Sequence, residues 1–178
     1  MKKFLLFLIM GLFILFSSSC LEVETWWVID ENGDISTELE LVSGSYTTDE
    51  EFNVYLETIK YAAPIISEIA KTQDYTVKKG YTQKPARKYT FTEKVNIENI
   101  ENVIYEEKED GTISFSLLIP KLFTEEPQSP DEVVFTIHIT LPREIDIANT
   151  TFYSGKEATW KITNEMLYKG TVLKAYTK

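Results

Sequence analysis

The feature that most constrains the fold is a pair of short, β-rich segments joined by an Asn-Gly turn. Residues 21–29 are rich in β-branched and aromatic side chains, and residues 35–42 alternate between apolar and polar side chains. Asn32 and Gly33 lie between them, and both residue types accept the positive φ of a tight hairpin turn. A period of two places alternate side chains on opposite faces of a strand. The sequence therefore predicts a β-hairpin here.

The same turn also carries part of a calcium-loop pattern. Asp30, Asn32 and Asp34 offer spaced oxygen ligands, but Gly33 stands at the fourth position of the loop. An EF-hand loop needs Gly at its sixth position and Glu at its twelfth. We interpret the segment as a hairpin turn, with a calcium loop as the alternative.

Alternating segments recur along the rest of the chain. Asp110 and Gly111 form a second turn signal, and Pro142 ends a long alternating run. The expected strands cover residues 75–78, 88–95, 104–107, 112–120, 132–141, 158–163 and 171–176. Tight turns between strands favour antiparallel pairing, so we expect one mainly antiparallel sheet of about seven to nine strands.

One segment, residues 49–71, changes to helical spacing. Its apolar side chains recur every three or four residues, and Thr48 or Asp49 is a suitable N-cap. Pro64 lies inside this pattern and should kink or split the helix. The polar face carries more Glu than Lys, which favours packing on the sheet over lying on a membrane surface.

These elements predict an α+β domain with one main helix covering one face of the sheet. A second, single helical turn is expected at residues 164–169, closed by Gly170. The other sheet face must be solvated, curled on itself, or covered by a ligand or partner.

Composition excludes several classes of site. The chain has 18 basic and 28 acidic side chains, and a net charge of −10 argues against nucleic-acid binding. With one Cys and one His, it lacks the four nitrogen or sulfur ligands of a structural zinc site. We expect no cofactor, no metal and no catalytic residue. His138 lies on the polar side of its strand and is interpreted as a surface or hydrogen-bonded residue and not as a catalytic base, with no partner that spacing can name.

Trp26 and Trp27 are the candidate ligand-binding residues. They are adjacent on one expected strand, so their side chains must point to opposite faces. At most one of them can lie in a core covered by the helix. The other is exposed or sits in a second apolar layer, where a large aromatic ring suits an amphipathic ligand. The alternative is that protein covers both faces of this strand.

The N-terminus has the three parts of an export signal. Lys2 and Lys3 precede 13 uncharged, almost wholly apolar residues at 4–16, and three serines then lead to Cys20. Thirteen helical residues cover about 20 Å, which is short of a hydrocarbon core of about 30 Å.

The position of the only cysteine resembles the bacterial lipoprotein signal, although Ser17 stands where that family prefers leucine. The resemblance implies cleavage between Ser19 and Cys20, lipid on Cys20, and a membrane-anchored mature domain of residues 20–178. That domain would carry 16 basic and 28 acidic side chains, a formal charge of −12. The alternatives are an ordinary signal peptide with an incidental cysteine, or a retained N-terminal helix.

The body of the chain resembles the LppM-type lipoprotein domain. The motifs that carry this resemblance are the early hairpin and helix, Phe135–Pro142, Asn149, Gly155, Thr159-Trp160 and Gly170–Ala175. The resemblance implies an α+β domain outside the cytoplasmic membrane, with lipid or glycolipid binding and no known catalytic residues. It fixes no ligand-contact residue.

We therefore expect a non-enzymatic, membrane-anchored envelope protein that binds a lipid, a glycolipid or another amphipathic ligand. A structural or protein-interaction module of the envelope is the alternative, and a carboxylate-dependent envelope hydrolase is a third class.

Overall fold

The computed structural model describes residues 21–150 and 152–178, so Ser19 and Cys20 lie outside the described residues. The helices are α2 (Asp49–Ala62), α3 (Ile65–Ile69), the 3₁₀ turn η1 (Ile97–Asn99) and α4 (Asn164–Lys169). The strands are β1 (Leu21–Ile29), β2 (Asp34–Ser43), β3 (Ala70–Lys79), β4 (Thr82–Phe91), β5 (Val95–Asn96), β6 (Val103–Glu107), β7 (Ile113–Ile119), β8 (Val133–Thr140), β9 (Ile145–Ala148), β10 (Phe152–Ser154), β11 (Glu157–Thr163) and β12 (Thr171–Thr177).

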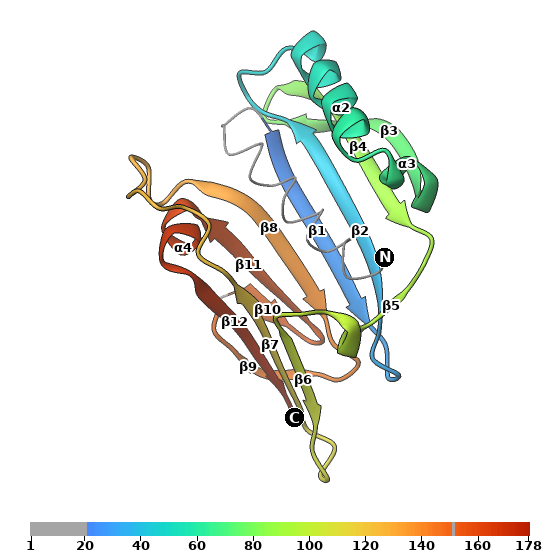
Figure 1. The fold of residues 1–178 in the computed structure, drawn as a ribbon, viewed down its shortest axis with the longest axis vertical. Coiled ribbons are helices and arrows are strands. Elements are labelled where there is room, and N and C mark those ends of the chain that lie inside the picture. Colours follow the sequence, from blue (N-terminus) through green and yellow to red (C-terminus); the bar gives the residue numbers. More distant parts are fainter. Residues whose placement is uncertain (1–20, 151) are drawn as a thin grey trace.

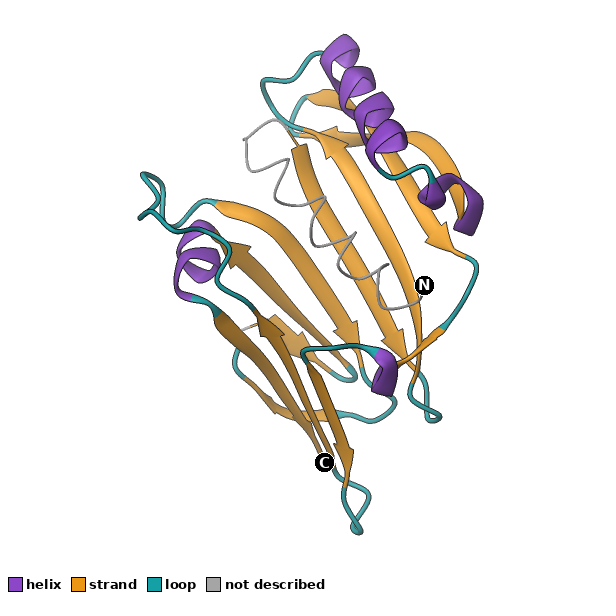
Figure 2. Cartoon of the chain, in the orientation of Figure 1, coloured by secondary structure: helices purple, strands orange, loops and turns teal. Residues whose placement is uncertain are grey.

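The strands form two sheets, where one was expected (Figures 1 and 2). Sheet A has eight strands in the order β10-β11-β8-β1-β2-β4-β3, with β5 pairing beside β2. Sheet B has the order β6-β7-β12-β9. The α+β class is confirmed. The expected strand number was too low, because β5, β9 and β10 span only two to four residues and show too little alternation to be recognised.

The predicted hairpin at the Asn-Gly turn is confirmed, since β1 pairs antiparallel with β2 along nine residue pairs from Leu21–Ser43 to Ile29–Ile35. On its other side β1 pairs with β8, and this pairing is parallel, so sheet A is mixed. The parallel pair joins residues more than 100 positions apart, such as Glu24 and Thr136. No local turn signal specifies such a pairing.

The expected split of the helix at Pro64 is confirmed. α2 ends at Ala62, and Pro64 is the N-cap of the short helix α3. Thr48 caps α2 in a capping box, in which its hydroxyl accepts from the Glu51 amide and its own amide donates to the Glu51 carboxylate. The helical range ends at residue 69 and not at 71, because Ala70 and Lys71 pair with β4 as the start of β3.

α2, α3 and sheet B all lie on the same side of sheet A (Figure 1). The odd-numbered side chains of β1, such as Val23 and Trp27, share one continuous core with Phe52 of α2 and Phe115 of β7. We call this side of sheet A the inner face. Elements of residues 21–150 and 152–178 form no covering layer on the opposite side, which we call the outer face.

Asn149 connects the two sheets through four hydrogen bonds. Its carboxamide oxygen accepts from the Trp160 indole at 2.9 Å and from the Lys174 amide at 2.7 Å. Its carboxamide nitrogen donates to the Val172 carbonyl at 2.7 Å, and its backbone amide donates to the Lys174 carbonyl at 3.0 Å. Trp160 belongs to β11 of sheet A, and Lys174 belongs to β12 of sheet B.

We expect Asn149→Ala to lower the free energy of unfolding by about 1–3 kcal/mol, because the buried Trp160 indole would lose its acceptor. Asn53→Ala, on the exposed side of α2, is the matched control and should change stability by less than about 0.5 kcal/mol. Urea unfolding followed by circular dichroism measures both. Equal effects of the two substitutions would contradict the role of Asn149.

Candidate functional site

The candidate site is a row of side chains that crosses the outer face of sheet A. Strand register aligns one residue from each of six neighbouring strands. From β10 to β4 the members are Phe152, Thr159, His138, Trp26, Glu38 and Thr90. We call these residues the Trp26 row. Cross-strand neighbours of this kind have Cβ atoms about 4.5–5.5 Å apart, so adjacent members contact one another.

The Trp26 ring has two neighbours, His138 in the same row and Lys88 beside the row. The His138 ring stacks on it at a centroid distance of 4.8 Å and an interplanar angle of 4°. The Lys88 ammonium lies 5.8 Å from the Trp26 ring centroid and forms an ion pair with Glu38 at 2.5 Å. Because β8 and β4 lie on opposite sides of β1, His138 and Lys88 approach the ring from opposite sides. The outward edge of the half-buried ring is what remains for a ligand.

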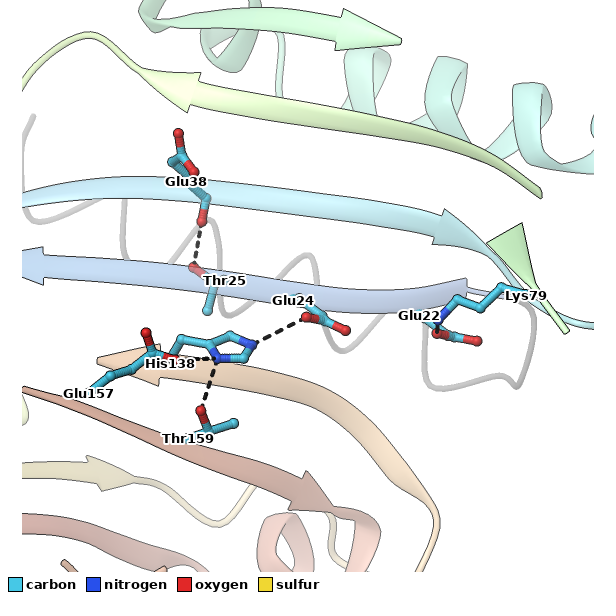
Figure 3. A network of polar contacts seen from close by, with 8 residues as sticks. All are labelled: Glu22, Glu24, Thr25, Glu38, Lys79, His138, Glu157 and Thr159. Carbon is cyan, nitrogen blue, oxygen red and sulfur yellow. Dashed lines mark hydrogen bonds and ion pairs between the residues drawn. The ribbon is translucent and has the colours of Figure 1, made fainter. Parts of the chain in front are cut away.

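His138 is held by polar groups on the two strands that flank β8, namely β1 and β11 (Figure 3). Its Nε2 lies 3.2 Å from the Glu24 carboxylate, and its Nδ1 lies 2.9 Å from the Thr159 hydroxyl and 3.5 Å from Glu157. Since a carboxylate only accepts, Nε2–H donates to Glu24. In the neutral ring Nδ1 then accepts from the Thr159 hydroxyl. His138 is therefore on the outer face, as the alternation predicts, but it is a partnered residue at the centre of a network.

Two neighbouring carboxyl groups in this network have pKa values shifted in opposite directions. The hydrogen bond from His138 lowers the pKa of Glu24, with burial opposing the shift. Burial, followed by the charge of Glu24, raises the pKa of Glu40. Glu24 and Glu40 are directly opposite each other on β1 and β2. The pair thus combines a carboxylate that ionises readily with one that resists ionisation.

The two candidate tryptophans point to opposite faces, as predicted. Trp26 lies on the outer face and Trp27 lies in the core, where it is 4% exposed. The Trp27 indole nitrogen has no hydrogen-bond partner. A buried donor of this kind costs stability, and its position makes Trp27 a core residue. The structure thus places the two candidates apart and gives only Trp26 access to the surface.

The calcium-loop alternative for residues 30–34 is not supported by the observed contacts. The Asp30 carboxylate accepts hydrogen bonds from the backbone amides of Asn32 and Asp34 and forms an ion pair with Lys94 at 2.8 Å. These contacts close the turn itself. The described residues contain no group of three or more His, Cys, Asp or Glu side chains placed to hold a metal ion.

A crevice of about 280 Å³ lies at the end of α2, beside α3 and the β3–β4 hairpin. Arg87 and Tyr89 line it on the sheet side and Ser67 on the helix side. The Arg87 guanidinium is already engaged by both oxygens of Asp74, at 2.6 and 2.8 Å. The lining is as polar as it is apolar, so this crevice does not match an apolar lipid cavity.

Sequence reasoning missed most of the network around Trp26. Glu24 could have been identified, because it shares the side of β1 that carries Trp26. The partnership of Glu24 with His138 could not, because it depends on the parallel pairing of β1 with β8. Lys88 and Thr159 likewise reach the site only through strand register.

Comparison with known proteins finds a distant likeness to a solved structure. No protein-family model matches the chain, and no curated protein sequence matches it. Among solved structures, the chain is similar to the NMR structure of the folded domain of the Mycobacterium tuberculosis LppM protein. The two share 12% sequence identity over 89% of this chain and 90% of that chain, with a TM-score of 0.45. A likeness at this level does not establish family membership.

Glu24→Gln and Glu40→Gln should change stability in opposite directions at pH 7. Glu24 has a lowered pKa in the folded state, so its contribution is present above its unfolded pKa and is lost as the pH falls through the folded value. We expect Glu24→Gln to cost about 1 kcal/mol at pH 7, discounted for its partial exposure, and progressively less as the pH falls below 4.5 and through the folded pKa of Glu24.

Glu40 has a raised pKa, so its ionisation opposes folding at pH 7. Glu40→Gln should stabilise the protein at pH 7, and this gain should disappear as the pH falls toward 4.5. Denaturant unfolding across this pH range measures both variants. The same sign for both at pH 7 would contradict the assignment.

Proposed function

We propose that this chain is a cell-envelope lipoprotein carried by lipid on Cys20. The proposal rests on the order of a basic start, a short apolar run, small residues and the single cysteine. A retained cysteine would lie directly before β1, so the folded domain would begin at the anchor. Within the described part of the chain, no helix is both long and apolar enough to cross a bilayer. Two or more acyl chains on one residue give stable attachment.

We further propose that the outer face of sheet A binds the polar head of an amphipathic ligand such as a glycolipid. The observation that carries this proposal is the Trp26 row. It combines exposed apolar groups, such as Phe152 at 58% exposure, with the Glu38 carboxylate and the Thr159 hydroxyl. Aromatic edges beside such polar groups suit sugar rings, which present both C–H faces and hydroxyl groups. The carboxylates would accept hydrogen bonds from those hydroxyls.

The proposed role is non-enzymatic. The best acid–base candidate is the Glu24–Glu40 pair, because its two pKa values are shifted apart. Glu24, however, is engaged by His138, and the pair lies on a sheet face in the middle of an ion-pair network. An envelope hydrolase using this pair remains the third class of function.

A protein-interaction role is the second candidate, and a specific observation favours it. The solvent side of α2 carries Val54, which is 65% exposed, and Tyr61, which is 91% exposed. Seven residues apart, they lie on one side of the helix, with Thr58 between them. The three residues line one shallow depression, which would accept an apolar side chain of a partner.

Cys20→Ser should abolish lipid attachment. We expect the wild-type protein, purified from its own membranes, to have the mass of residues 20–178 plus a diacylglyceryl group. The variant should keep its signal peptide or be released from the membrane. An unmodified wild-type chain, or a variant that is cleaved and yet stays membrane-bound, would contradict the anchor.

Ligand binding at the Trp26 row should change the environment of one tryptophan among three. The protein is labelled with 5-fluorotryptophan and placed in lipid nanodiscs, and ¹⁹F NMR then reports Trp26, Trp27 and Trp160 separately. Adding a diglycosyl diacylglycerol to the nanodiscs should shift the Trp26 signal saturably and leave the other two in place. Trp26→Phe identifies the signal.

Thr159→Val should weaken this response, whereas Tyr61→Ala, on the distant side of α2, should leave it unchanged. A response lost in Tyr61→Ala and kept in Thr159→Val would favour the α2 surface instead. An unmoved Trp26 signal at saturating glycolipid would contradict binding at the row.

A further inference from the structure

Three segments meet at the end of the molecule where β1 begins. Leu21 pairs with Ser43 at the end of β2, and the β2–α2 loop follows directly. The β3–β4 hairpin extends beyond this point, because β2 pairs with β4 only as far as Ala86. Lys84 then ties the hairpin to the β2–α2 loop by donating to the carbonyls of Ser45 at 3.0 Å and Thr47 at 3.2 Å.

This end carries the two most exposed tyrosines of the described residues. Tyr46 in the β2–α2 loop is 93% exposed, and Tyr81 at the β3–β4 turn is fully exposed. Three lysines stand beside them in the same hairpin. We call the set formed by Tyr46, Lys78, Lys79, Tyr81 and Lys84 the anchor-proximal rim. Tyrosine and lysine are the side chains that suit the water–membrane boundary, since each has an apolar body and a polar tip.

The residue that follows Cys20 is fixed beside this rim. No residue separates Cys20 from Leu21, and Leu21 is 5% exposed and paired within sheet A. Glu22, the next residue, forms an ion pair at 2.5 Å with Lys79 of the rim (Figure 3). A lipid on Cys20 would therefore hold the rim at the membrane without an intervening linker.

Charge differs between this end of the molecule and the opposite end. The β1–β2 and β6–β7 turns lie at the opposite end of the molecule and are rich in Asp and Glu (Figure 1). Acidic residues also occur near the rim, at the start of α2 and in the loop that precedes β8. Of these, Glu51 is engaged in the capping box of α2. The three lysines of the rim offset the carboxylates near them, so an anionic surface should repel the loop before β8 more strongly than the rim.

We propose that the anchor-proximal rim docks on the bilayer surface, with Tyr46 and Tyr81 at the level of the lipid headgroups. This inference rests on the proposed lipid anchor at Cys20. β1 then runs away from the membrane, the β3–β4 side tilts toward it, and the outer face of sheet A stays open to headgroups that project from the same bilayer.

A cysteine introduced into the lipidated mature chain can be labelled selectively, because Cys20 is the only natural cysteine and its thiol would carry lipid. Single-cysteine variants Ser45→Cys, Glu126→Cys and Asp110→Cys would carry an environment-sensitive NBD dye in vesicles containing phosphatidylglycerol. The dye at position 45 should emit at shorter wavelength and be quenched by headgroup spin-labelled lipids. The dyes at position 126, in the loop before β8, and at position 110, at the far end, should behave as in water.

The tyrosines are then tested in the Ser45→Cys background. The double substitution Tyr46→Ser and Tyr81→Ser should reverse the wavelength shift, whereas Tyr153→Ser, which removes an exposed aromatic ring outside both the rim and the Trp26 row, should not. Equal emission from the dyes at positions 45 and 110 in protein that floats with the vesicles would overturn the rim while leaving the anchor intact. Protein that fails to float would overturn the anchor and the rim together.

Discussion

The two sheets are held together by the apolar core that they share, and the carboxamide of Asn149 joins them by hydrogen bonds at its edge. Its oxygen accepts from one residue of each sheet, Trp160 and Lys174, and its nitrogen donates to the carbonyl of Val172. Neither a shorter side chain nor a charged one provides the same donors and acceptors in this geometry. These hydrogen bonds reinforce the packing of sheet B on the inner face of sheet A. The core that the two sheets share includes Trp160 of sheet A and Leu173 of sheet B.

Within the described part of the chain, this arrangement covers one face of sheet A and leaves the other without a layer. A bare sheet face must be kept soluble by its own side chains, and the outer face achieves this with contacts between neighbouring strands. Glu24, His138, Trp26, Lys88 and Glu38 form a continuous series of a carboxylate, an imidazole, an indole, an ammonium and a second carboxylate. The same series that stabilises the face also leaves an aromatic edge and hydroxyl groups exposed, which is why we assign binding to this surface.

The sequence predicted the local elements well and their assembly poorly. The hairpin at Asn32-Gly33, the helix break at Pro64 and the opposite directions of Trp26 and Trp27 follow from short-range chemistry, and each is observed. The second sheet and the parallel pairing of β1 with β8 depend on contacts between distant segments, for which no local pattern exists. His138 shows the consequence, because its partners come from β1 and β11 and could not be named from the sequence.

The position of β1 within sheet A determines how the domain responds to force. β1 is the first strand described, and it lies between β2 and β8, with nine paired residues on one side and five on the other. A pull on the residue before Leu21 acts along the strand axis and loads these hydrogen bonds in shear. They must then break together and not one after another, as they would at a peeled edge strand. Pulling on β1 is consequently resisted by hydrogen bonds on both of its sides, whereas an edge strand such as β3 is held on one side only.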